Sequence, residues 1–170
     1  MKNRQLGRSA VVGVLAVCVA LAAILAVLPA TTVNAAELNQ GGVALENLLK
    51  REQIVINNQQ ERLTLSQQAV EKAQQWLADL QVEGKEVSAL PAALSAFQNG
   101  LAQAQTSFNT AKQVLDAHAG FDANGQVTNA AQALKTLVDA GRAERQFHLT
   151  ITQATIDFRA AVRAYLQANK

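Results

Sequence analysis

Residues 45–80 read LENLLKREQIVINNQQERLTLSQQAVEKAQQWLADL, and their spacing decides the fold. Alternating steps of four and three residues meet Leu45, Leu49, Glu52, Ile56, Gln59, Leu63, Ser66, Val70, Ala73, Leu77 and Leu80. No glycine or proline interrupts this heptad, which predicts one long α-helix over about 43–82. A second stripe, at Leu48, Val55, Arg62, Ala69 and Trp76, widens the face enough to receive two neighbouring helices.

Two further helices are predicted downstream. Ser88 is a candidate N-cap and Gly120 a helix terminator, which places a second helix at about 88–119. A third apolar column predicts a helix over about 129–168. The short links between the helices leave no room for a long crossover. We therefore expect an all-α fold over residues 43–170, an up-down-up antiparallel three-helix bundle with coiled-coil-like packing.

The amino-terminal residues 1–35 have the pattern of a signal peptide or membrane anchor. Residues 10–28 are apolar and uncharged, and the basic flank before them consists of Lys2, Arg4 and Arg8. Two outcomes remain open: cleavage between Ala35 and Ala36, or retention of residues 10–28 as an anchor. In both cases the remainder is exported, into the periplasm or the extracellular space. Residues 36–42 would then be a short linker.

The net charge argues against nucleic acid as a partner. The whole chain carries +2, but three of its cations and none of its acids precede Ala36. From Ala36 onward twelve cations face thirteen acids, a net charge of −1. Cys18 is the only cysteine, so no disulfide is expected after residue 35.

Polar residues inside the predicted core are the candidate site. Counting levels back from each link predicts two buried layers, one of Glu52 with His118 and Asn129, the other of Ser66 with Glu144. Such layers specify helix register in coiled coils, and the other interpretations are a small-molecule site or a metal site inside the bundle. The histidine and glutamate spacing does not match a di-metal bundle, so we expect no metal.

No catalytic motif and no cofactor site are predicted. The loop after Gly120 contains Asp122, Asn124 and Gly125, but it lacks the ligands of a calcium loop and is predicted to be an Asn-Gly turn. Four arginines in the third helix predict either a solvated face or a partner-binding basic strip: Arg142, Arg145, Arg159 and Arg163.

One short motif occurs twice. Leu63–Gln67 (LTLSQ) and Leu149–Gln153 (LTITQ) both fit LTxxQ. Paired LTxxQ motifs resemble those of a family of small periplasmic stress proteins, which includes helical chaperones and signalling repressors. The resemblance covers ten residues, and both copies lie within predicted helices, whereas in that family they lie at helix starts. The overall pattern also resembles exported helical-bundle proteins of bacteria to which no activity is attached.

These features predict an exported, non-enzymatic binding or scaffolding protein of the bacterial cell envelope, with a protein partner or self-association and no nucleic acid. A membrane contact is expected through the amino-terminal segment if that segment is retained. The alternatives are a periplasmic chaperone or stress-sensing regulator of the LTxxQ type, which needs an exposed apolar groove, and a ligand-sensing bundle, which needs a cavity at Glu52, His118 or Glu144.

Overall fold

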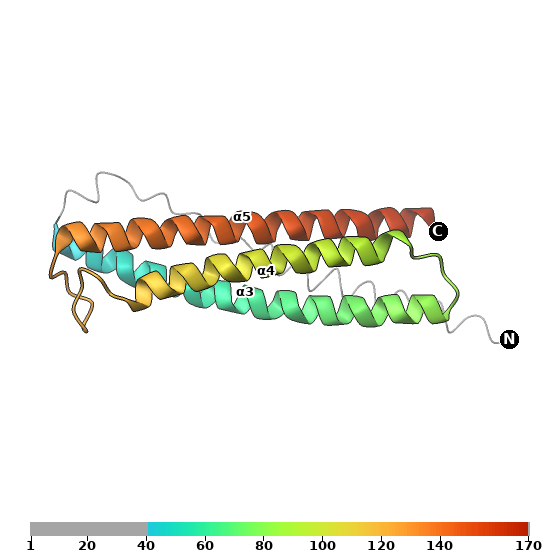
Figure 1. The fold of residues 1–170 in the computed structure, drawn as a ribbon, viewed down its shortest axis with the longest axis horizontal. Coiled ribbons are helices and arrows are strands. Elements are labelled where there is room, and N and C mark those ends of the chain that lie inside the picture. The colour runs from blue at the N-terminus through green and yellow to red at the C-terminus, as the bar shows by residue number, and fades with distance from the viewer. Residues whose placement is uncertain (1–40, 170) are drawn as a thin grey trace. The chain divides into compact units, whose positions relative to one another are not determined.

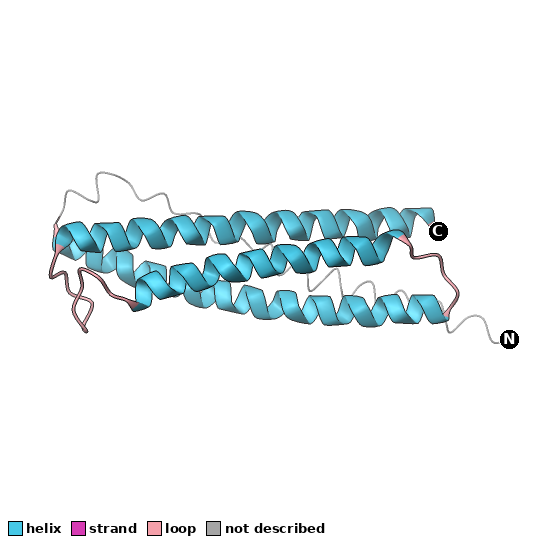
Figure 2. Cartoon of the chain, viewed as in Figure 1, coloured by secondary structure: helices cyan, strands magenta, loops and turns pink. Residues whose placement is uncertain are grey.

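The computed structural model describes residues 41–169, which form three helices. They are α3 (Gly42–Val82), α4 (Ala89–Asp116) and α5 (Ala130–Ala168), labelled in Figure 1. Outside these helices the described residues are loops and turns with one isolated bridge, between Phe121 and Val127 (Figure 2). The all-α class expected from the heptads is confirmed. The predicted signal or anchor segment, with Ala35 and Ala36, lies outside the described residues.

The described residues divide into two compact units, and each helix contributes a segment to both. We call residues 41–61 and 103–149 the loop unit, because it contains the connection between α4 and α5. We call residues 62–102 and 150–169 the terminal unit, because it contains the end of α5.

Aromatic side chains fill the terminal unit. The rings of Phe97 and Phe158 stack with centroids 5.4 Å apart, so α4 contacts α5 there. Trp76 and Tyr165 meet edge to face at 5.7 Å, which joins α3 to α5. Phe97 and Phe158 are almost completely buried, and burial of such side chains is the main stabilising term in a helical core.

Glycine ends α3 in the terminal unit. The Gly84 backbone has φ +70°, a conformation that glycine adopts without strain. Its amide donates to the Gln81 carbonyl at 3.0 Å, and the next amide, of Lys85, donates to the Leu80 carbonyl at 2.9 Å. This is the Schellman pattern, which satisfies carbonyls that the last turn would otherwise leave without donors.

The loop unit holds the α4–α5 connection against the helices. Phe108 and Phe147 lie with ring centroids 6.4 Å apart. The carbonyl of Ala119, which lies beyond the end of α4, accepts a hydrogen bond from the Thr136 hydroxyl of α5 at 2.8 Å. A methyl group at Gly120 would lie 2.1 Å from the Ala133 nitrogen, so only glycine fits between the loop and α5.

The first turn of α5 is capped by a side chain. Asn129 immediately precedes the helix, and its Oδ1 accepts a hydrogen bond from the Gln132 amide at 3.1 Å. The end of α4 differs from expectation, because the helix stops at Asp116 and residues 117–120 form turns in which His118 has φ +48°. The chain therefore leaves α4 almost one turn earlier than Gly120 alone would indicate.

Candidate functional site

Two buried acids meet in the loop unit. Glu52 comes from α3 and Glu144 from α5, and their side chains are only 8% and 7% exposed. They are joined by a side-chain hydrogen bond. On the same face of α3, two turns beyond Glu52, the Gln59 amide donates to the Glu144 backbone carbonyl at 3.4 Å. We refer to Glu52, Gln59 and Glu144 as the acid-pair cluster.

Burial holds a proton on the acid pair. It raises the pKa of Glu144 from 4.5 to about 10, and the hydrogen bond and negative charge of Glu52 add to this effect. Glu144 is therefore protonated at neutral pH and donates its hydrogen bond to Glu52. Protonation removes the charge of Glu144, which lowers the cost of burying this carboxyl group.

The acid-pair cluster is not fully satisfied within the described residues. Glu144 Oε1 and Gln59 Oε1 are buried there without a hydrogen-bond partner. An acceptor that loses water without gaining a donor costs free energy, of order 1–3 kcal/mol per group. Apolar side chains at these positions would leave no polar atom unpaired, as is the case for the buried rings of Phe108 and Phe147 in the same unit.

The remaining predicted site residues have other partners. His118 is half-buried, and its Nδ1 lies 3.2 Å from the Asp116 carbonyl oxygen. Asn129 is exposed and caps α5. Ser66 is buried in the terminal unit, where its hydroxyl donates to the Arg62 carbonyl one turn earlier, at 2.7 Å. The structure thus brings together Glu52 and Glu144, which the sequence analysis had assigned to different layers.

The register of the loop explains this difference. The level count placed Ala119 opposite Thr128, whereas the structure places it against Thr136, about two helical turns further along α5. The Phe108–Phe147 contact has the same register. Glu144 consequently reaches the level of Glu52, and the assignment of Glu52 to a layer with His118 and Asn129 is replaced by the acid pair.

A second feature of the loop unit is an exposed stripe on α5. Steps of four, three and four residues connect Val138, Arg142, Arg145 and Leu149, which therefore share one face of the helix. Val138 is 41% and Leu149 57% exposed, and both arginines are exposed. We call these four residues the α5 stripe. The arginines were predicted from the sequence, whereas the two aliphatic residues were not, although they are spaced three and four residues from the arginines.

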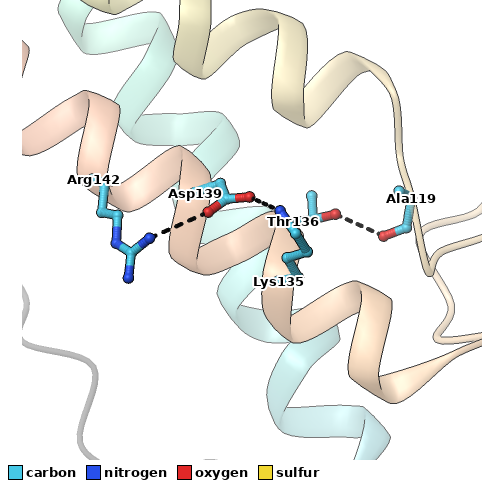
Figure 3. A network of polar contacts seen from close by, with 5 residues as sticks. All are labelled: Ala119, Lys135, Thr136, Asp139 and Arg142. Carbon is cyan, nitrogen blue, oxygen red and sulfur yellow. Dashed lines mark hydrogen bonds and ion pairs between the residues drawn. The ribbon is translucent and has the colours of Figure 1, made fainter.

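Ion pairs along α5 leave the stripe basic. Asp139 pairs with Lys135 and, at 3.6 Å, with Arg142 (Figure 3). The hydrogen bond from Lys135 lowers the pKa of Asp139, which therefore remains charged at neutral pH. Lys135, Arg142 and Arg145 are thus accompanied by one half-buried acid, Asp139, which gives a net charge of +2 over three turns of helix.

The LTxxQ copies lie in different surroundings. Leu63, which opens the first copy, is completely buried in α3, whereas Leu149, which opens the second, is exposed in the α5 stripe. The two copies therefore do not present equivalent surfaces.

Within the terminal unit, a hollow of about 80 Å³ lies between α4 and α5, lined by Ala93, Ala96, Phe97, Ala154, Asp157 and Phe158. Residues 41–169 contain no group of three or more acidic, histidine or cysteine side chains that could hold a metal ion. None of the three described helices is apolar enough over its length to span a membrane.

Comparison with known proteins gave no match to a family model, a curated protein or a solved structure.

Proposed function

We propose that this chain is an exported, non-enzymatic helical protein of the bacterial cell envelope that works by binding or scaffolding. In this proposal the described helices form one up-down-up antiparallel bundle with coiled-coil-like packing, and residues 1–35 direct export. The observation that supports binding is the α5 stripe, where two arginines lie between two exposed aliphatic side chains on one helix face.

The composition of the stripe supports this proposal. Arginine is enriched at protein interfaces because its guanidinium group combines an apolar surface with several hydrogen-bond donors. On a helix face that contacted only water, Gln or Lys could replace Val138 and Leu149 without any loss of buried apolar surface. A partner that covered both residues would remove their apolar surface from water.

A chaperone or stress-sensing regulator is the second candidate. The observation that favours it is the exposure of Leu149, the first residue of an LTxxQ copy, within the same stripe. Both candidates use the α5 stripe. They differ in the partner, because a chaperone would bind many unfolded chains and a scaffolding protein would bind one folded component.

The experiment is a chemical cross-linking and pull-down of the full chain from the envelope of the producing cells. We expect Arg142→Glu/Arg145→Glu to reduce partner recovery at least tenfold. The control Lys50→Glu/Lys72→Glu makes the same charge change at exposed positions on α3 and should retain the partner. Equal recovery with both double variants would contradict binding through the stripe, and recovery of one dominant partner would favour scaffolding over chaperone activity.

A further inference from the structure

We infer that the α5 stripe docks onto an anionic phospholipid surface. This inference rests on the proposed function, since it names the partner of the same binding face. The occupant is identified by its chemistry, a surface with negative headgroups above an apolar interior.

The stripe has the two kinds of side chain that such a surface accepts. Leu149 and Val138 are aliphatic and exposed, and so can enter the boundary between headgroups and acyl chains. Arg142 and Arg145 lie between them along the helix and have long stems, which lets each guanidinium group reach a phosphate while its stem stays with the apolar residues. No ion pair of Arg145 is found among the described residues.

The charge of the stripe is local and not a property of the whole chain. With Glu144 protonated, Lys135, Asp139, Arg142 and Arg145 give residues 135–149 of α5 a charge of +2, whereas residues 36–170 together carry no net charge. A basic stripe on a protein without net charge would draw that helix face toward an anionic surface.

The sequence upstream of α3 favours a lipid surface over an acidic protein. Residues 10–28 form an apolar segment long enough to enter a bilayer. Residues 29–41 separate it from α3, and a linker of this length spans at most about 45 Å. Because α3 begins in the loop unit, which also holds the stripe, a retained segment would keep the stripe within reach of the membrane.

The number of charges fits a tethered protein. Two arginines and one lysine are too few to hold a free protein on a membrane, but a tether raises the effective concentration at the surface and makes a weak contact persistent. An acidic protein partner would not need this proximity, and it is the other outcome of the test.

The test uses the full chain reconstituted into vesicles and collected by flotation. A nitroxide label is placed at Leu149→Cys, and a matched control label at Ile54→Cys, both in a Cys18→Ser background. Ile54 belongs to the same unit and is 59% exposed, against 57% for Leu149, but it lies on α3. Collision rates with oxygen, which concentrates in lipid, and with a water-soluble nickel complex report the environment of each label.

In phosphatidylglycerol-containing vesicles we expect the Leu149→Cys label to move from the aqueous to the lipid-exposed class, with at least a threefold rise in the oxygen-to-nickel ratio. The ratio should fall to the aqueous value in pure phosphatidylcholine vesicles, and also when Arg142→Glu/Arg145→Glu is added. The Ile54→Cys label should remain aqueous throughout. Circular dichroism of each variant confirms that the helices are retained.

Three results would overturn the inference: an aqueous Leu149→Cys label in anionic vesicles, equal lipid exposure at Ile54→Cys, or no difference between the two lipid compositions. An aqueous label combined with a stripe-dependent protein partner in the pull-down would remove the lipid surface and leave the proposed function standing. If the Leu149→Cys label stayed aqueous and the pull-down also recovered no stripe-dependent partner, the proposed function would be contradicted as well.

Discussion

The loop unit and the terminal unit contain segments of the same three helices, yet they pair their buried polar groups in opposite ways. In the terminal unit Ser66 and Thr155 are completely buried, and each hydroxyl donates to a carbonyl one turn earlier in its own helix, of Arg62 and Ile151. Each of these bonds satisfies a hydroxyl within its own helix, so it does not determine how that helix aligns with its neighbours.

In the loop unit the buried polar groups pair between elements. Glu52 of α3 bonds to Glu144 of α5, Gln59 reaches the Glu144 carbonyl, and Thr136 of α5 bonds to Ala119 of the loop. A slip of one turn would break all of these bonds and leave acids buried without partners. We infer that the loop unit uses polar pairing to specify its register, whereas the terminal unit relies on aromatic packing.

The largest expected effect tests the aromatic packing. Phe158→Ala removes a ring that is stacked on Phe97 and almost completely buried, so it should lower the free energy of unfolding by about 3–5 kcal/mol. Urea denaturation followed by the fluorescence of Trp76, the single tryptophan, measures the change in the same unit. The control Ile156→Ala, at an exposed position on the same helix, should stay within about 0.5 kcal/mol of wild type. Equal losses in both variants would show that this unit does not depend on its aromatic core.

The second prediction concerns pH and belongs to the loop unit. The folded state keeps the Glu144 proton up to about pH 10, whereas the unfolded state loses it above its ordinary pKa of 4.5. The folded state therefore binds more protons between these values. The contribution of Glu144 to stability is therefore greatest below pH 4.5 and falls as the pH rises, with a slope of up to about 1.4 kcal/mol per pH unit and a loss on the order of 3 kcal/mol by pH 7.

Glu144→Gln isolates this effect, because an amide can still donate to Glu52 but does not titrate. We expect its urea midpoint to be nearly constant from pH 5 to pH 9, while that of wild type falls. Glu61→Gln, at an exposed position of α3 in the same unit, should retain the wild-type slope. A Glu144→Gln protein with the wild-type slope would mean that another group holds the proton.

The sequence was sufficient for the helices but not for the pairing. Heptad spacing is a local property, so Leu45, Leu49 and the residues that follow in the same steps predicted α3 and its buried face without reference to the rest of the chain. The same spacing identified Glu52 and Glu144 as polar residues in apolar faces, and both are buried.

Their partnership depended on where α4 stops and how the loop returns. With the left-handed turn at His118 and the Thr136–Ala119 bond, α5 is shifted along α4 by about two turns from the predicted register. The periodic spacing of apolar residues within a helix does not predict such a shift. The α5 stripe was missed for another reason. Val138 and Leu149 lie outside the seam, and only the observed exposure shows that no described helix covers them.

The third prediction tests whether the terminal unit also has a device that specifies register, one based on shape. A methyl group at Gly100 of α4 would lie 2.6 Å from the Ala154 methyl carbon of α5, so the helices must separate to accept it. We expect Gly100→Ala to lose about 1–2 kcal/mol, because overpacking outweighs the gain of about 1 kcal/mol in helix propensity. Thermal unfolding measures the loss, and Gly100→Ala/Ala154→Gly should recover most of it. A stable single variant would leave this unit with aromatic packing alone.

The smallest effect has the opposite sign and lies in the loop unit. Gly141 is within α5, has a helical backbone, and has no heavy atom within 4 Å of the position a methyl group would take. Gly141→Ala therefore gains helix propensity without a clash, and the unfolding free energy should rise by about 0.5–1 kcal/mol. Measured in parallel by thermal unfolding, the same substitution should thus destabilise at Gly100 and stabilise at Gly141. If Gly141→Ala also destabilised the protein, α5 would have a close neighbour there, and the register of the loop unit would depend on shape as well as on its acid pair.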